Sequence, residues 1–562
     1  MQLQKRLEQL RVNLFEPINI MPLVIFRVLF GGIMLWEVFR FFSHGWIRGH
    51  YMDPSFLFTY YGFGWVQPLP GDGMIWLFYA LGVICFLIII GLMYRVSMFA
   101  FFIVFTYIFL LDQSRYLNHF YLISLLGFIL MFMPLHRAYS LDALLDPKLR
   151  ATTAPRWALY WLRIQIGIPY VYGAFAKMNT DWLLGEPMRE WLSARTDFPL
   201  VGQYYTTWWA PYFFSYGGLL LDLLAVPLLL WRRTRWVALI GVSFFHVMNA
   251  NLFPIGIFPW MMLGASLIFF PPEWFNIFTK PLERSSDETH HNKSRPLPLN
   301  WQYTILGLIG IYVVWQLLFP FRHFLYPGEV SWTEEGHRFA WHMRLRDKDA
   351  IIRVFVEDEQ GNQQEINVLD YVNPRQRNKM AARPDMILQF AHHIEATMQQ
   401  QGYGNVAVRA WVMASLNSRP PQLLVDPTVD LTQYRHGMYA NAFVLPLKQP
   451  HSGLPNTVMG IGYDGERLVF VNTGYAPVPL HDVSLLIDDG SRADAQLFQD
   501  TLIGGRCMIV DTIQQVANES FLCEPTHIPL MDGVAESVTV FVGAQQIGRC
   551  RPDAGMCLVS VP

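Results

Sequence analysis

Nine apolar runs, each near the length of a membrane-spanning helix, occupy most of the first 320 residues of this 562-residue chain. A helix crosses the hydrocarbon core of a bilayer with about 17–25 mostly apolar residues. Only 15% of the residues are charged, whereas soluble domains carry about 25%. The sequence therefore predicts an integral membrane protein, with spans at about 22–42, 74–92, 96–113, 118–135, 157–177, 212–230, 236–250, 254–270 and 301–320.

The stretch from 236 to 270 is the least regular part of the apolar region. Asn249, Asn251 and Pro254 interrupt it, so it forms either two short spans or a re-entrant pair. Beyond the last apolar run, alternating patterns predict a hairpin around Gly361. The sequence after that hairpin predicts a helix over 376–401 and a buried strand over 406–414.

The expected fold is a multi-pass α-helical membrane bundle of about nine spans, followed by an extracytoplasmic mixed α/β and β-sandwich-like region. We divide it into a transmembrane domain over 1–320, an α/β region over 321–450 and a small β-sandwich-like domain over 451–562. Lysine and arginine concentrate in the N-terminal tail and in every second loop, which predicts a cytoplasmic N-terminus and an exported C-terminal region. Four cysteines there allow two disulfides in three possible pairings: Cys507, Cys523, Cys550 and Cys557.

Polar residues inside the apolar runs carry most of the functional information, because lipid-facing positions exclude them. Arg27, early in the first span, is interpreted as a structural residue that reaches the cytoplasmic headgroups. A second group lies near the outer ends of several predicted spans: Asn118, His119, Lys177, His246 and Asn249. A single histidine in a bundle is more often a packing residue, and Lys177 has Asp181 as an alternative partner. The common depth of the group nevertheless favours one cavity that opens toward the exported region.

A lysine in such a cavity has a specific chemical use. Burial disfavours the charged form of an amine, and a neutral amine at pH 7 is a general base. Its substrate must carry a weakly acidic proton and must reach a pocket inside the membrane. A lipid-soluble quinol meets both conditions. The net charge of −2 excludes a generally basic nucleic-acid binder.

Several strings occur together and in order along the chain: FRVLFG, GLMYRVS, FLLDQSRYLNHFYL, AFAKMNTDW, FHVMNANLFPIGIFPWMML, PPEW, SWTEEGHRFAWHM and LLVDPTVDL. They resemble the vitamin K-dependent γ-glutamyl carboxylase family, in a bacterial-type homologue with the horizontally transferred transmembrane domain. The resemblance covers roughly residues 15–435. It implies an enzyme that carboxylates glutamate in a protein or peptide, with reduced vitamin K, O2 and CO2 as co-substrates, release of the quinone epoxide and no metal.

The resemblance also implies roles for individual residues. The family's active-site lysine falls on Lys177. Its hydroquinone-binding residues fall on Asn118, His119, His246 and Asn249, and tryptophans of its glutamate-binding stretch on Trp332 and Trp341. The implied partners are membrane lipid, a glutamate-containing protein or peptide, and an enzyme that reduces the quinone.

The sequence departs from the vertebrate members mainly on the glutamate side. Ala176 stands where they have a second lysine, and a tyrosine implicated in holding the glutamate is replaced near Glu329. Glu334 and Glu335 follow, and acidic groups repel an anionic substrate. The chain also lacks the early cysteine of the vertebrate disulfide. The shorter C-terminal tail and the lack of eukaryotic-style signals favour a bacterial inner membrane.

Two alternatives to the carboxylase hypothesis therefore stay open. The first is quinol epoxidation without carboxylation or with another acceptor, which the departures on the glutamate side motivate. The second is a transporter or a lipid-binding membrane protein, which only the buried polar residues motivate. The sequence shows no inverted repeat of the transporter kind.

Overall fold

The computed structural model describes residues 2–447, apart from 254, 279–296, 362 and 420, and beyond these the backbone of the strands between Val458 and Ser560. The chain divides into two compact units. The first unit contains Met1–Ala176, Gly218–Leu325 and Gly336–Met343, and the second contains Lys177–Gly217, Tyr326–Glu335 and Arg344–Pro562. Each unit is described by itself below.

The first unit is helical. Each of the nine apolar ranges contains a helix: α2 (Met21–Ser43), α3 (Gly73–Ile90), α4 (Tyr94–Leu110), α5 (Asn118–Leu130), α7 (Arg156–Ala176), α10 (Ala210–Leu230), α11 (Arg235–Leu252), α12 (Phe258–Ser266) and α14 (Leu299–Leu318). Among the described residues, four helices are long and apolar enough to cross a membrane, namely α2, α3, α10 and the stretch that begins with α14. The predicted helices are therefore present, and the number of nine crossings stays a prediction.

Short length in α4 and α5, and arginines in α7, explain why these three helices are not among the four. Helices α4 and α5 are apolar, but they contain only 17 and 13 residues. Helix α7 has 21 residues and includes Arg156, Arg163 and Pro169. Arg163 donates to the carbonyl oxygens of Ile268 and Phe270 at 2.8 and 2.9 Å. Its charge is therefore bound by backbone oxygens that lie past the end of α12.

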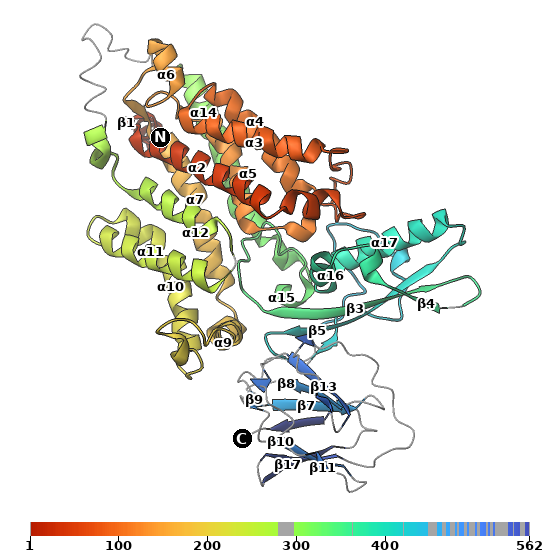
Figure 1. Cartoon of the computed structure of the whole chain (residues 1–562). Helices are drawn as coiled ribbons and strands as arrows, with labels where there is room; N and C mark the ends of the chain where they lie inside the picture. Colours follow the sequence, from red (N-terminus) through yellow and green to blue (C-terminus); the bar gives the residue numbers. More distant parts are fainter. Residues whose placement is uncertain are drawn as a thin grey trace. The chain divides into compact units, whose positions relative to one another are not determined.

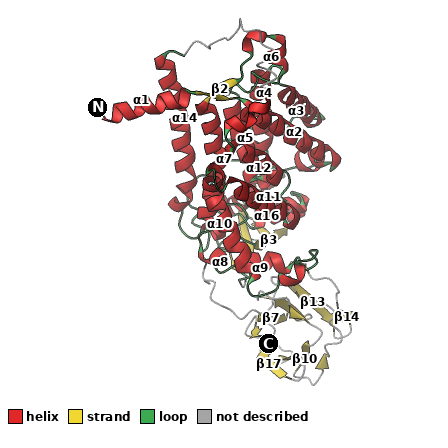
Figure 2. Ribbon diagram, turned by 90° about the vertical axis from the view of Figure 1, so that its left-hand side faces the viewer, coloured by secondary structure: helices red, strands yellow, loops and turns green. Residues whose placement is uncertain are grey.

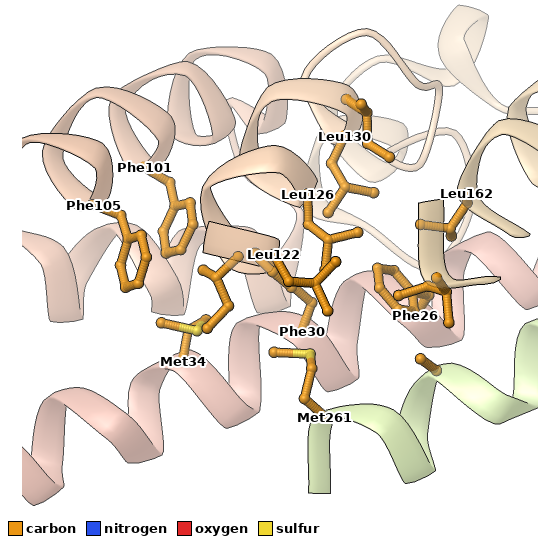
Figure 3. Close-up of a cluster of buried hydrophobic side chains, with 14 of the residues drawn as sticks. Phe26, Phe30, Met34, Phe101, Phe105, Leu122, Leu126, Leu130, Leu162 and Met261 are labelled. Atoms are coloured by element: carbon orange, nitrogen blue, oxygen red, sulfur yellow. The ribbon is translucent and has the colours of Figure 1, made fainter. Parts of the chain in front are cut away.

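The core of the first unit lies between α2, α4, α5, α7 and α12 (Figure 3). Helices α2 to α5 pack on one another in chain order (Figure 2). Phe30 of α2 meets Phe101 of α4 edge to face, with ring centroids 5.2 Å apart. Since lipid is as apolar as these side chains, close packing stabilises helix contacts inside a bilayer more than the hydrophobic effect does.

Arg27 corrects one sequence prediction. Its side chain is 1% exposed and does not extend to a lipid headgroup. The guanidinium donates to the carbonyl oxygens of Leu135, at 2.8 Å, and of Tyr139. A charge buried in protein needs such hydrogen bonds. Arg27 thus fastens the loop that follows α5 to α2. Its role is structural, as expected, but it comes from hydrogen bonds within the protein and not from contact with lipid headgroups.

The second unit has a four-stranded antiparallel sheet with the order β4-β3-β5-β6. These strands are β3 (Lys348–Glu357), β4 (Gln363–Ile366), β5 (Ala407–Leu416) and β6 (Gln422–Leu423). The predicted hairpin around Gly361 is confirmed, because β3 and β4 pair antiparallel across that glycine, whose φ is 84°. The predicted strand over 406–414 is β5, and its side chains are alternately buried and half-buried.

The predicted helix over 376–401 is two helices, α16 (Pro374–Ala381) and α17 (Pro384–Gln400). Pro384 explains the break, because a proline disfavours helical geometry in the preceding residue, here Arg383. Helix α16 packs against β3 and α17 against β5 (Figure 1). Asn373 and Gln376 form a capping box at the start of α16.

The last hundred residues contain further strands. One set comprises β7 (Val458–Tyr463), β8 (Leu468–Asn472), β13 (Arg506–Thr512), β14 (Gln515–Val516), β15 (Phe521–Leu522) and β18 (Cys557–Ser560). These form a sheet with the order β14-β13-β8-β7-β18, with β15 on β13. A second sheet has the order β11-β10-β16-β17 and comprises β10 (Val483–Ile487), β11 (Arg492–Ala493), β16 (Val538–Val542) and β17 (Gln545–Cys550). The side chains of this region, including the four cysteines, lie outside the described residues. The sandwich-like domain and the disulfides stay predictions.

Candidate active site

Two of the predicted histidines lie on the same aromatic ring in the first unit. His119 is the second residue of α5, and His246 is on α11. The His119 and His246 rings lie 5.8 and 6.1 Å from the ring of Phe258, which begins α12. The fold therefore brings these two residues together from positions 127 apart in the sequence.

The two ring nitrogens of His246 differ in their hydrogen bonding. Its side chain is 1% exposed, and Nε2 lies 2.8 Å from the hydroxyl oxygen of Tyr170 on α7. Its Nδ1 is buried without a hydrogen-bond partner among the described residues. When the Tyr170 hydroxyl donates to Nε2, the proton of a neutral imidazole lies on Nδ1. In that tautomer His246 can donate a hydrogen bond to a ligand.

Asn118 is fixed at the start of α5 by the segment Gly336–Met343. Its Nδ2 donates to the carbonyl oxygen of His342 at 2.9 Å, and its Oδ1 accepts from the Tyr116 hydroxyl at 2.9 Å. That segment has a constrained backbone, since Phe339 and Trp341 both have φ of 60°, which side chains other than glycine seldom adopt. Such conformations persist where the surroundings enforce them, and they cluster at functional sites.

Asn249 lies three residues after His246 on α11 and is half-buried. Residues spaced by three share a helix face. The helix therefore places the Asn249 amide on the side that carries His246. Its backbone oxygen accepts from the Phe253 amide at 3.0 Å, at the end of the helix.

Lys177 belongs to the second unit and directly follows the last residue of α7. The side chain is 6% exposed, and Nζ lies 5.3 Å from the ring centroid of Trp182. Trp182 is itself buried, and its indole donates to the carbonyl oxygen of Ser215 at 2.8 Å. The ammonium or amine of Lys177 is therefore enclosed against an aromatic face, where a cation gains about 0.5–2 kcal/mol.

Asp181, the alternative partner that the sequence offered Lys177, is bound by Arg419 and Asn417, and its pairing with Lys177 stays a prediction. Arg419 donates hydrogen bonds to both carboxylate oxygens, at 2.6 and 2.7 Å, and Asn417 donates to Oδ2 at 2.5 Å. The side chains of Asp181 and Arg419 are 6% and 5% exposed. This buried pair attaches helix α8 (Thr180–Leu183), three residues beyond Lys177, to the turn after β5.

The two tryptophans of the predicted glutamate site are buried in different units. Trp341 packs against Tyr121 of α5, with ring centroids 4.9 Å apart and the rings tilted by 34°. Trp332, in α15 (Val330–Thr333), donates from its indole to the carbonyl oxygen of Leu445 at 2.7 Å. Both are at most 1% exposed. In these positions they support the fold, and their contact with a peptide stays a prediction.

The two acids that follow Trp332 have different partners. Glu334 accepts from the Arg346 guanidinium through both carboxylate oxygens, and Arg383 lies 3.8 Å away. Glu335 accepts from the backbone and side-chain nitrogens of Asn441 at 2.7 and 2.9 Å. Burial raises the pKa of Glu335. Arg346 therefore offsets the charge of Glu334, whereas Asn441 is uncharged and only hydrogen-bonds Glu335.

Two family models match this chain in succession. The HTTM domain matches residues 15–274, and the vitamin K-dependent gamma-carboxylase, lumenal domain, matches residues 301–450. The chain belongs to the vitamin K-dependent gamma-carboxylase family. No solved structure matches the chain.

Membership in the gamma-carboxylase family confirms the resemblance seen in the sequence. It implies a membrane-associated enzyme of the carboxylase type, dependence on vitamin K, and glutamate-containing proteins as substrates. The HTTM match contains Lys177 and the four candidate hydroquinone residues, and the lumenal match contains Trp332 and Trp341. Among the described residues, no group of three or more His, Cys, Asp or Glu could hold a metal ion.

Sequence reasoning missed two buried acids of this gamma-carboxylase family member. Glu37 of α2 pairs with Arg40 at 2.6 Å. Asp222 of α10 is 5% exposed, and a side chain at Gly173 of α7 would come within 3.1 Å of its carboxylate. Asp222 also acts electrostatically on Tyr170. Both acids lie in apolar runs, so the rule that identified Lys177 applied to them as well.

Proposed function

We propose that this protein carboxylates glutamate in an exported protein or peptide and couples that reaction to epoxidation of reduced vitamin K by O2. The match of both carboxylase domains, in order along one chain, carries the proposal. The proposed location is a bacterial inner membrane, with a cytoplasmic N-terminus and the lumenal-type domain outside. A quinone-reducing enzyme would regenerate the hydroquinone.

The candidate residues fit a hydroquinone. A ligand with a flat apolar ring and hydroxyl groups complements the faces of Phe258 and the unpartnered Nδ1 of His246. No described residue hydrogen-bonds the imidazole of His119, which lies on the same phenylalanine. When bound, the hydroquinone supplies, together with O2, the strong base that removes a γ-proton of glutamate before CO2 adds to that carbon.

In this proposal Lys177 is the general base. Its Nζ accepts the proton of a quinol hydroxyl when the amine is neutral. His246 donates from Nδ1 to a ligand oxygen, and Asn118, His119 and Asn249 orient the ring. The aromatic walls exclude water, which would otherwise quench a strong base.

The proposed glutamate side rests on the lumenal-type domain. With Glu334 paired with Arg346, this acid presents little free negative charge to a substrate. This observation supports carboxylation over the alternative of epoxidation alone, because the ion pair offsets one of the departures that motivated the alternative. We propose that the strained segment around Trp341 lies near the bound peptide.

The test uses the purified full chain in lipid nanodiscs with reduced phylloquinone or menaquinone, labelled CO2 and a glutamate peptide. Formation of epoxide together with labelled peptide is the expected result. Lys177→Ala abolishes both products, and Lys177→Arg does not restore them, because arginine stays protonated. Lys148→Ala, at an exposed loop lysine, leaves both rates unchanged.

Each of the other outcomes decides between hypotheses. Epoxide without labelled peptide supports the alternative enzyme, which oxidises quinol without carboxylating glutamate. Neither product from folded protein that binds the quinol overturns both enzymatic hypotheses. Equal activity in Lys177→Ala and Lys148→Ala overturns the role of Lys177 while leaving the reaction in place.

A further inference from the structure

Three cations follow one face of helix α16 and its C-terminal turn in the second unit. Arg375, Lys379 and Arg383 are spaced by four residues, and side chains at that spacing are neighbours on a helix. The Arg383 guanidinium lies 3.5 Å from the carbonyl oxygen of Lys379, so this face continues past the last helical residue. We call Arg375, Lys379 and Arg383 the basic face.

Like charges at this spacing destabilise a helix unless something offsets them. The Arg383 charge, then burial and the Arg375 charge, lower the pKa of Lys379 to about 8. Glu334 is the single acid among the described groups with a principal effect on Lys379, and it already pairs with Arg346. Among the described residues, neither Arg375 nor Lys379 has a carboxylate within ion-pair distance.

A half-buried lysine connects the end of α16 to the tryptophan of the predicted glutamate site. Lys348 of β3 donates from Nζ to the carbonyl oxygens of Ala382, at 2.9 Å, and Trp332. Its Nζ also lies 5.1 Å from the Trp332 ring centroid. One side chain therefore joins the end of α16 to α15.

We propose that the basic face docks an acidic stretch of the peptide substrate, with carboxylates that neighbour the glutamate to be modified. Glu334 demonstrates the chemistry, because its carboxylate is already bound by Arg346 and lies beside Arg383. Neighbouring cations on the face are about 6 Å apart, and alternate residues of an extended peptide are about 6.6 Å apart. An extended chain with acids at alternate positions complements this spacing, and the inference rests on the proposed function.

The binding test needs neither quinol nor CO2. A fluorescent peptide with three glutamates at alternate positions is titrated into the full chain in nanodiscs of zwitterionic lipid, and anisotropy is measured. We expect Lys379→Glu to weaken binding by about tenfold or more, and Lys379→Gln by less, because a reversed charge adds repulsion. Higher ionic strength weakens wild-type binding, since salt screens exposed charges. The same peptide with glutamine in place of glutamate binds poorly.

Arg377→Glu is the matched control. It makes the same kind of charge reversal on the same helix, two residues from Lys379 and hence on the opposite face. Arg377 has a different neighbour, the Asn378 side chain. The control keeps wild-type affinity for the glutamate peptide. Equal weakening in Arg377→Glu and Lys379→Glu, or equal binding of the glutamine peptide, overturns the proposal.

Two further outcomes separate this inference from the proposed function. If the enzyme carboxylates the peptide, Lys379→Glu raises KM without lowering kcat, and an unchanged KM overturns docking at the basic face while the reaction stands. If wild-type protein makes no carboxyglutamate but still shows face-dependent peptide binding, the proposed function fails and docking stands. Vesicles of anionic lipid are also added as a competitor. If they displace the peptide from the protein, the peptide is not the occupant of the basic face and the proposal is overturned.

Discussion

Two polar regions of the molecule differ in charge. One is the group of residues around Phe258 in the first unit, and the other is the basic face in the second unit. Around Phe258, imidazole, hydroxyl and aromatic groups meet through neutral hydrogen bonds, such as that between Tyr170 and His246 at 2.8 Å. Around α16, guanidinium and ammonium groups surround one carboxylate, that of Glu334. The two regions are therefore built for ligands of different charge.

This difference follows from where each region lies in the sequence. A net charge in an apolar helix bundle is costly, and a neutral hydrogen-bonding site avoids that cost. A surface of soluble composition tolerates excess charge, which then attracts a partner of opposite sign. A carboxylase needs both kinds of site, because its quinol is neutral and apolar while its glutamate is anionic.

The largest expected effect concerns the buried ion pair beside Lys177. Asp181→Ala leaves Arg419 buried without its carboxylate, and breaking a buried pair costs about 3–5 kcal/mol. We expect a clear fall in the thermal unfolding temperature of the second unit. Asp197→Ala is the control in the same chain segment, because the carboxylate of Asp197 is 83% exposed and lies 3.8 Å from Arg195. Equal shifts in the two variants would show that Asp181 is not a buried anchor.

The sequence revealed local features better than distant partners. Apolar length predicted the helices, and alternation predicted the β3–β4 hairpin around Gly361. Asp181 and Arg419 are 238 residues apart, and no local pattern connects them. Two local signals were present in the sequence and would have improved the prediction. Pro384 marks the break between α16 and α17, and Asp222 is a carboxylate inside an apolar run.

The candidate site shows the same limit. Residue type and depth singled out His119 and His246, but their meeting at Phe258 depends on how α5, α11 and α12 pack. The strings shared with a known family then implied roles for these residues. Only the folded chain shows that Tyr170 leaves Nδ1 of His246 available.

The second prediction tests the neutral character of the region around Phe258. Tyr170→Phe removes the hydroxyl that holds His246, and an unsatisfied buried nitrogen costs about 1–3 kcal/mol. We expect quinol binding to weaken by about tenfold and by the same factor at low and high salt, since neutral bonds are not screened. Tyr312→Phe is the control, because it removes a hydroxyl bound to Gln165 at 2.6 Å in the same bundle. A quinol affinity that falls equally in both variants would assign the effect to general loosening of the bundle.

The third prediction tests the charged character of the basic face through pH. The pKa of Lys379 is lowered to about 8, first by the Arg383 charge, then by burial, while Arg375 and Arg344 act in the same direction and Glu334 opposes them. Lys379 therefore loses its proton between pH 7 and 9.5, and we expect affinity for the acidic peptide to fall several-fold across that range. Lys379→Arg keeps its charge and removes this dependence.

The same shift has a sign for stability. A lysine with a pKa lowered on folding binds fewer protons in the folded state than in the unfolded state between about pH 8 and its ordinary value near 10.5. Stability therefore rises with pH through that window. Thermal unfolding of Lys379→Met should lack this dependence on pH.

The affinity for the acidic peptide is a separate measurement. A wild-type affinity that is flat from pH 7 to 9.5 would contradict the assignment of Lys379 as a docking cation.

The smallest expected effect lies at the Arg353–Glu365 pair, which bridges β3 and β4 with side chains 24% and 44% exposed. Solvent-exposed pairs contribute about 0–1 kcal/mol, so Glu365→Gln should shift thermal unfolding by a degree or two at low salt and by less at 0.5 M salt. Binding of the acidic peptide should not fall, because the change removes a negative charge and leaves the three cations of the basic face in place. A loss of acidic-peptide affinity in Glu365→Gln would mean that any charge on the sheet influences docking, and the contrast between a charged docking face and the neutral quinol region would then lose its basis.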